Sequence, residues 1–211
     1  ELKMNDTNEN NPLGYEKLSE LLKRFAIPSI IAMVVSSLYN IVDQIFIGQG
    51  VGYLGNAATN VAFPLTTICL ANTLLISIGS ASRFSLSLGE GDADRAAQAV
   101  GNALAMMVLF GILYTLCIEI FLVPLLNAFG ATQDVLPYAI EYTRITAVGM
   151  PLLIITNGMS NLARADGSPN YSMMCMLIGA IINTILDPLF IFKFHMGVRG
   201  AAFATVIGQF F

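Results

Sequence analysis

The chain has 211 residues, of which 55% are hydrophobic and only 11% are charged. Soluble domains carry about 25% charged residues, so this composition excludes an ordinary soluble core and favours a helical protein that crosses a membrane several times. The net charge of −4 matters less than the positions of Lys and Arg along the chain.

The N-terminal part of the chain is polar. Residues 1–14 are rich in asparagine, which is typical of a leader without stable structure. Residues 15–24 have apolar side chains at helical spacing between charges, so we expect an amphipathic helix at the membrane surface. The apolar run that follows is too long for a signal peptide, and none is predicted.

Runs of about 20 apolar residues are long enough to cross the hydrocarbon core of a bilayer. The sequence contains five such runs and the start of a sixth, which is still apolar at the last residue. The predicted spans are residues 25–47, 57–82, 97–122, 138–162, 171–192 and, incomplete, 200–211. We therefore predict an all-α polytopic membrane protein that is truncated within its sixth helix.

Basic residues are distributed unevenly between the predicted loops. One side holds seven of them: Lys3, Lys17, Lys23, Arg24, Arg83, Arg95 and Arg164. The loops of the other side hold only Lys193 and Arg199. Because cytoplasmic loops carry an excess of Lys and Arg, the N-terminus is predicted to be cytoplasmic. We expect two local ion pairs, Arg164 with Asp166 and Arg144 with Glu141.

Two predicted spans each contain a single acidic residue. Asp43 is the only charge in residues 25–82, and Asp187 is the only charge in residues 167–192. A charged group at the bilayer centre costs about 2.5–3.5 kcal/mol on insertion scales, so such residues usually have a function. Both lie about 24–27 Å along their helices from the same membrane surface, because a helix rises 1.5 Å per residue. They are therefore predicted to lie at equal depth.

Polar side chains accompany both carboxylates. Asn183 lies one helical turn before Asp187, and Asn40 lies three residues before Asp43. Oxygen ligands alone suit Na⁺ or a shared proton, whereas zinc prefers His and Cys. Two adjacent carboxylates cannot both stay ionised without a proton or cation between them. A coupling site for Na⁺ or H⁺ is therefore predicted, and the alternative is a static polar contact between helices.

Four segments, taken together, resemble the multidrug and toxic compound extrusion (MATE) family, and most closely its prokaryotic DinF/MepA-like members. The segments are 39–48, 164–169, 183–191 and 197–205. The resemblance implies a twelve-helix transporter of two six-helix lobes, of which this chain would be the N-terminal lobe. It implies export of organic cations and amphipathic drugs, in exchange for Na⁺ or H⁺, across a prokaryotic cytoplasmic membrane.

The resemblance also implies roles for further residues. Thr205 and Tyr142 would join the cation site, in which the candidate Na⁺ ligands are Asp43, Asn183, Asp187 and Thr205. A substrate cavity would be lined by Tyr39, Asn157 and Met176, together with Ser36 in the same polar segment as Tyr39. The implied partners are small organic substrates, the lipid bilayer and a C-terminal lobe, without nucleic acid.

Other functions fit the sequence less well. It shows no nucleophile–base pair, phosphate-binding loop or metal-ligand motif, so neither an enzyme activity nor a cofactor is expected. A flippase for lipid-linked oligosaccharides, within the same superfamily, would need a basic cavity, whereas Arg144 is almost the only basic residue within the spans. A non-transporting membrane scaffold is the remaining alternative, and it predicts that the two aspartates are replaceable by Asn.

Overall fold

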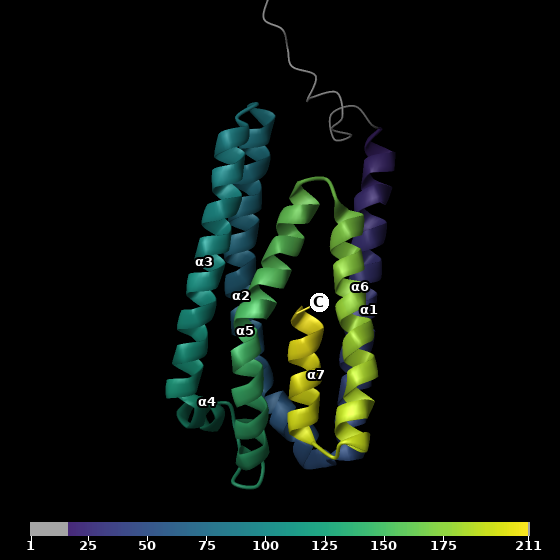
Figure 1. The fold of residues 1–211 in the computed structure, drawn as a ribbon, viewed down its shortest axis with the longest axis vertical. Coiled ribbons are helices and arrows are strands. Elements are labelled where there is room, and N and C mark those ends of the chain that lie inside the picture. Colours follow the sequence, from purple (N-terminus) through teal and green to yellow (C-terminus); the bar gives the residue numbers. More distant parts are fainter. Residues whose placement is uncertain (1–16, 211) are drawn as a thin grey trace, which may run out of the picture.

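The computed structural model describes residues 17–210, and regular structure within this range is entirely helical (Figure 1). Five helices are long and apolar enough to cross a membrane, which confirms an all-α polytopic membrane protein. The elements are α1 (Leu18–Gly50), α2 (Tyr53–Gly89), α3 (Ala93–Ile120), α4 (Leu122–Ala128), α5 (Leu136–Ala165), α6 (Pro169–Pro188), the π-helical segment η2 (Leu189–Lys193) and α7 (Val198–Phe210). The predicted leader, residues 1–14, lies outside the described residues.

Two elements differ from the sequence prediction. Helix α1 runs without a break from Leu18 to Gly50, so residues 18–24 continue the first long helix and do not form a separate one. These residues are good helix formers without Gly or Pro, and nothing interrupts them before the apolar run. The short α4 was not predicted, because its residues prolong the apolar run of α3. Pro124 cannot donate to the carbonyl of Ile120, so a new helix begins where α3 ends.

The helices form two groups that meet at α7. Helices α2, α3 and α5 pack against one another, and α1 packs mainly against α6. Helix α7 lies between α5 and α6 and contacts both (Figure 1). Helices α1 and α2 are joined by a short turn but touch each other little. As a result, α5, α6, α7 and α1 enclose the interior in which the predicted site residues lie.

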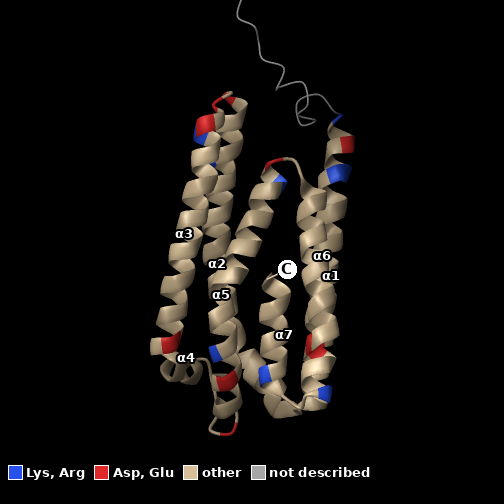
Figure 2. Cartoon of the chain, in the orientation of Figure 1, with Lys and Arg blue, Asp and Glu red and all other residues tan. Residues whose placement is uncertain are grey.

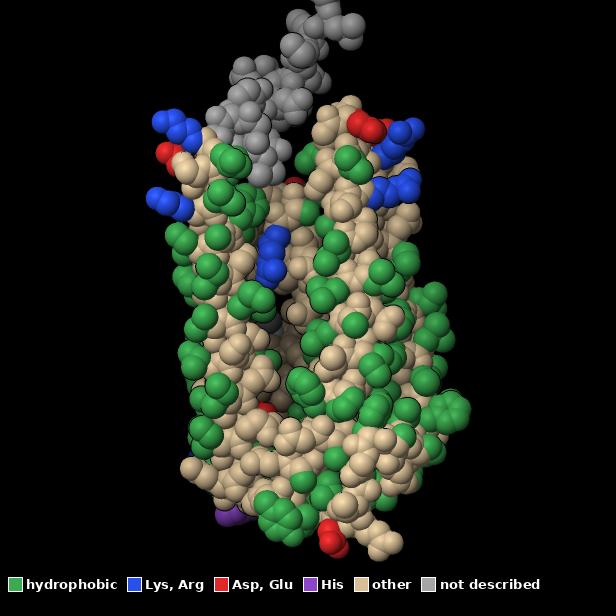
Figure 3. Space-filling view, turned by 180° about the vertical axis from the view of Figure 1, so that it is seen from behind, with side chains coloured by type: hydrophobic (Ala, Val, Ile, Leu, Met, Phe, Trp, Pro, Cys, Tyr) green, Lys and Arg blue, Asp and Glu red, His purple; other side chains and the backbone are tan. Residues whose placement is uncertain are grey.

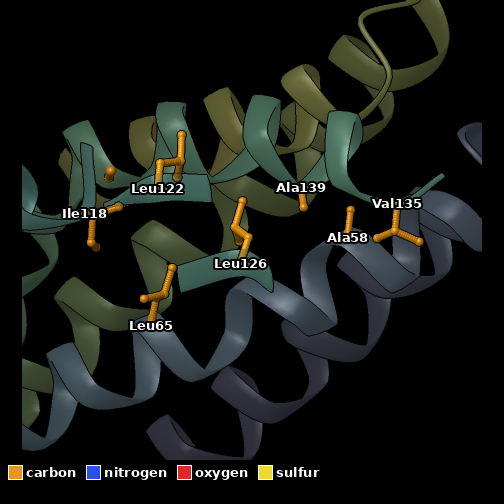
Figure 4. Close-up of a cluster of buried hydrophobic side chains, with 8 residues drawn as sticks. Ala58, Leu65, Ile118, Leu122, Leu126, Val135 and Ala139 are labelled. Atoms are coloured by element: carbon orange, nitrogen blue, oxygen red, sulfur yellow. The ribbon is translucent and has the colours of Figure 1, made fainter. Parts of the chain in front are cut away.

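The first group is held by apolar contacts between small and medium side chains. One buried cluster, where α2, α3, α4 and α5 meet, is drawn in Figure 4: Ala58, Leu65, Ile118, Leu122, Leu126, Val135, Ala139 and Ala147. Large apolar side chains face outward instead, such as Leu75 and Ile120, which are 75% and 71% exposed. This distribution is expected of helices whose surroundings are lipid and whose interfaces need close approach.

Charged residues gather at the two ends of the bundle (Figure 2). We call the end that holds the start of α1 and the α2–α3 and α5–α6 turns the basic end, because Lys17, Lys23, Arg24, Arg83, Arg95 and Arg164 belong to it. Buried acidic residues are the exception to this surface distribution. Among the described residues these are Asp43, 8% exposed, and Asp187, which is completely buried.

Candidate functional site

Asp43 and Asp187 lie together inside the bundle, toward the end opposite the basic end. Asp43 belongs to α1 and Asp187 to the last turn of α6. Their carboxyl groups face each other within hydrogen-bonding reach. Each keeps one buried oxygen, Oδ1, without a hydrogen-bond partner. Two carboxylates so placed require a shared proton or a bound cation, because buried like charges repel and desolvation penalises both.

Asn183 connects the carboxylate pair to α7. With its amide oriented so that both ends are satisfied, Nδ2 donates to Asp187 Oδ2 (3.1 Å) and Oδ1 accepts from the Thr205 backbone N–H (3.2 Å). Two glycines allow this close approach of α6 and α7. A Cβ on Gly179 would lie only 2.6 Å from the carbonyl oxygen of Gly208. The glycines therefore place the Asn183 amide against the backbone of α7.

Tyr142 completes the site from α5. Its hydroxyl lies beside the side chain of Thr205, and the residue lies close enough to both carboxylates and to Tyr39 to interact with them electrostatically. Thr205 Oγ1 also donates to the carbonyl of Ala201, one turn earlier in α7. The structure therefore brings five of the six predicted coupling residues together, from four helices.

Asn40, the sixth predicted coupling residue, lies outside this group. Its Nδ2 donates to the backbone carbonyl of Ser36 (2.7 Å), and the residue is exposed. It lines a different groove, on the surface formed by α1 and the start of α2. Residues three apart differ by about 60° around a helix, and here the packing of α1 leaves Asn40 on the exposed side of that angle while Asp43 is buried. The structure therefore does not bring Asn40 to the carboxylate pair.

The end of the site away from the basic end is closed. Ile47 of α1, Ile191 of η2 and Ala201 of α7 form a small buried cluster there. Pro188 follows Asp187 directly and has no N–H to bond the carbonyl of Thr184, and the π-helical turns of η2 begin after it. Such local departures from α-helical geometry are frequent at functional sites.

On the side facing the basic end, the site opens into what we call the polar cavity, about 120 Å³ in volume. The predicted substrate residues Ser36, Tyr39, Asn157 and Met176 all line it, with Asn183 and Thr205. Drug-sized ligands occupy pockets of about 300–1,000 Å³, whereas a water molecule takes about 30 Å³. In this conformation the polar cavity can therefore hold a few waters or an ion, and it would have to enlarge to admit a drug.

Gln209 is a residue of the site that was not predicted from the sequence. It lies one turn after Thr205 on the same face of α7 and lines the polar cavity. Its Oε1 is buried without a partner, and its backbone carbonyl accepts from Thr156 Oγ1 of α5 (3.0 Å). Its spacing of four residues from Thr205 is the sequence feature that would have placed it on the same face of the helix as the site. Within residues 17–210 no cluster of three His, Cys, Asp or Glu side chains occurs, so the candidate ligands are oxygens of two carboxylates and neighbouring neutral groups.

The chain is similar in sequence to known membrane transporters. The chain is 28% identical to a FAD transporter of Shewanella oneidensis, over 90% of the chain and 42% of that protein. It is also 28% identical to the multidrug export protein MepA of Staphylococcus haemolyticus, over 95% of the chain and 45% of that protein. The chain thus spans less than half the length of these curated relatives.

Solved structures show the same fold. The MATE multidrug transporter DinF-BH superposes with a TM-score of 0.88 at 37% identity, over 93% of this chain and 44% of that one. An outward-facing MATE family transporter of the MOP superfamily gives a TM-score of 0.84 at 29% identity, over 90% of this chain and 42% of that one. The MatE family model matches residues 28–189, most of the chain. The chain therefore belongs to the MatE family and has the fold of its N-terminal lobe.

Proposed function

We propose that this chain is the N-terminal lobe of a secondary antiporter that exports amphipathic organic compounds, organic cations among them, in exchange for Na⁺ or H⁺. The observation that carries the proposal is the Asp43–Asp187 pair. Two buried carboxylates face each other with unpartnered oxygens and no basic side chain between them. A static contact between helices would use neutral or oppositely charged partners, since a like-charged pair is stable only with a proton or cation.

The geometry indicates how binding at this pair could affect the substrate. Ser36 and Tyr39 of α1 form one wall of the polar cavity, and Asp43 lies further along the same helix. A proton or Na⁺ would neutralise the pair and draw α1 toward α6, which keeps the cavity small and favours substrate release. Loss of the ion would let α1 move away and enlarge the cavity. Each ligand would thus shift the equilibrium between the same two positions of α1.

The coupling ion is expected to enter from the side opposite the basic end. The excess of Lys and Arg supports a cytoplasmic location of the basic end. The similarity to bacterial transporters supports the inner membrane of a prokaryote. A proton needs only the two carboxylates. Na⁺ would in addition use the Thr205 hydroxyl oxygen and the Asn183 amide oxygen, which here accepts from the Thr205 backbone N–H and would have to turn toward the pair. The donor set is compatible with both ions, so imposed gradients are needed to distinguish them.

The test uses the complete gene product in proteoliposomes with a fluorescent cationic dye as substrate. Dye transport is measured under an imposed Na⁺ gradient and, separately, under an imposed H⁺ gradient. The wild type should respond to at least one gradient, and Asp43→Asn should abolish that response. Asp94→Asn, which removes an exposed carboxylate in the first turn of α3, is the matched control and should transport normally. Unchanged gradient-driven transport by Asp43→Asn would contradict the coupling role.

The same experiment separates the alternatives. A non-transporting scaffold would form no dye gradient even as the wild type. A flippase would translocate a labelled lipid-linked oligosaccharide and ignore the imposed ion gradients. In a MOP superfamily transporter from Pyrococcus furiosus, 29% identical with a TM-score of 0.84, the reverse polarity of the binding pocket suggests a different function. Transport of an anionic dye should therefore be measured beside that of the cationic one.

A further inference from the structure

The polar cavity continues toward the basic end. A second cavity, about 450 Å³, lies on that side between α5 and α6. The two cavities share Thr156, Ser160 and Cys175 in their walls. Seen from behind, the bundle is hollowed along its middle, with a basic side chain in the upper part of the hollow and an acidic one deep below it (Figure 3). Polar groups and open space therefore extend from the carboxylate pair toward the basic end.

Arg164 lies at the point where the polar cavity approaches that end. The sequence predicted an ion pair between Arg164 and Asp166, but the structure does not contain it. Within residues 17–210, Arg164 forms no ion pair. Its Nε donates to the buried hydroxyl of Ser172 (3.0 Å), and its Nη2 contacts Met176 Sδ (3.4 Å). Met176 lines the polar cavity, and Ser172 lines the larger one. The half-buried guanidinium is thus held across the α5–α6 gap, in contact with one residue of each cavity wall.

While the polar cavity is as narrow as in this conformation, a fixed positive charge in this position opposes the passage of small cations. Other basic residues at this end, such as Arg83, lie exposed on the surface, where water screens them. Inside the bundle the effective dielectric constant is lower, so the same charge acts more strongly on an ion passing nearby. Arginine side chains that line membrane pores exclude protons and other cations in this way.

We propose that the polar cavity is the inner section of the coupling-ion route and that Arg164 is the electrostatic barrier at its end. The barrier prevents Na⁺ or H⁺ that has reached Asp43 and Asp187 from leaking to the basic end without substrate exchange. Gln209, which lines the polar cavity, is one of the polar groups that an ion or its waters would meet on the way from the pair toward the basic end. This inference rests on the proposed function, because it assumes that the pair binds the coupling ion.

The test measures passive ion leak through the complete gene product in proteoliposomes without substrate, with an internal pH dye or a Na⁺-sensitive dye. Arg164→Gln should raise the leak about tenfold, which is the size of effect that one unit charge has on an ion about 10 Å away when the effective dielectric constant is near 20. Arg164→Lys should stay near the wild type, because it keeps the charge. Arg83→Gln removes an exposed charge from the same end and should not change the leak.

Two further variants locate the route. Asp43→Asn combined with Arg164→Gln should abolish the extra leak if the route passes the carboxylate pair. Ser172→Ala releases the guanidinium without removing it and should give an intermediate leak, which tests the barrier even if Arg164→Gln does not fold. Leak at the wild-type level in both Arg164→Gln and Ser172→Ala would overturn the barrier, and a persistent leak in the double variant would overturn the route. Failure of the proposed function itself would show separately, as absence of gradient-driven dye transport in the wild type.

Discussion

The end of the bundle opposite the basic end handles charge in two contrasting ways. On its surface, opposite charges meet: Arg199 Nη2 lies 2.6 Å from Glu141 Oε1, and Arg144 Nε lies 3.6 Å from Glu119 Oε2. In its interior, Asp43 and Asp187 face each other although both are acidic. The two arrangements adjoin, because Glu141 precedes Tyr142 of the site.

The contrast shows where the protein supplies a counter-charge and where it leaves one out. Exposed ion pairs are screened by water and contribute little to stability, so they can be formed or lost at low cost. A buried charge without an opposite partner is costly, and a buried arginine would permanently offset one of the two charges of this pair. Among residues 17–210 no buried basic side chain lies there. The missing positive charge is therefore best explained as mobile, and the following predictions test this explanation against a purely structural role.

The largest effect is expected from Asp187→Asn in the complete gene product. Gradient-driven dye transport should fall at least about a hundredfold, because the pair can no longer bind and release a cation. Thermal stability should stay equal or rise, because the variant removes a buried like charge while keeping the side-chain volume. Transport in proteoliposomes and the melting temperature in detergent are measured on the same preparations.

The exposed pair supplies the matched control. Glu141→Gln removes one carboxylate from the same end of the bundle and should leave transport within about twofold of the wild type. If Asp187→Asn instead lost stability and transport together, the carboxylate would be holding the helices in place. The contrast between a functional and a structural pair would then be wrong.

Sequence reasoning found the pair because a lone charge in an apolar helix is conspicuous, and the rise per residue fixes its depth. It could not find the ion pairs. Glu141 and Arg144 are one turn apart, which allows a local pair, but in the structure their partners come from α7 and α3. Which helices adjoin is a tertiary property that spacing along one helix does not contain. Tyr142 and Thr205 were likewise placed only by family resemblance.

Element boundaries were predicted less well than the number of spans. Hydropathy marks the apolar middle of each helix, but α2 extends at both ends beyond the predicted residues 57–82, from Tyr53 to Gly89. Polar helical turns outside the hydrocarbon give no hydropathy signal. The outward orientation of Asn40 was missed for a related reason: a helical wheel gives angles, but only packing decides which face turns inward.

A smaller effect is expected from changing the helix contact that builds the site. Gly179→Ala would place a Cβ 2.6 Å from the carbonyl oxygen of Gly208, so α6 and α7 must separate. Overpacking of this kind costs about 1–3 kcal/mol, and the displaced Asn183 should also weaken ion binding. In α3, a Cβ on Gly101 would meet nothing within 4 Å, so Gly101→Ala should keep or slightly raise stability. Equal melting temperatures for the two variants would contradict the close approach.

Removal of a single hydroxyl should have a still smaller effect. Thr205→Val removes the hydroxyl that lies beside Tyr142, and the loss of a polar neighbour in a buried site costs about 1–3 kcal/mol. Ion affinity, measured as the gradient needed for half-maximal transport, should fall about tenfold. Thr184→Val is the control, because the Thr184 hydroxyl bonds only the Ala180 carbonyl of its own helix (2.8 Å). An equal loss of affinity in both variants would exclude a specific role for Thr205.

The smallest effect is expected from Arg199→Gln, which breaks the exposed ion pair with Glu141. The hydrogen bond with Glu141 raises the pKa of Arg199. The contribution of this ion pair to folding stability is therefore fully present below the usual arginine pKa and is lost only at still higher pH. Between about pH 5 and 9 the difference between variant and wild type should therefore be constant. It should also shrink with added salt, because both side chains are exposed. A loss of coupling in Arg199→Gln that salt does not reduce would show that the surface pair belongs to the ion site, and the two arrangements of charge would then have to be treated as one.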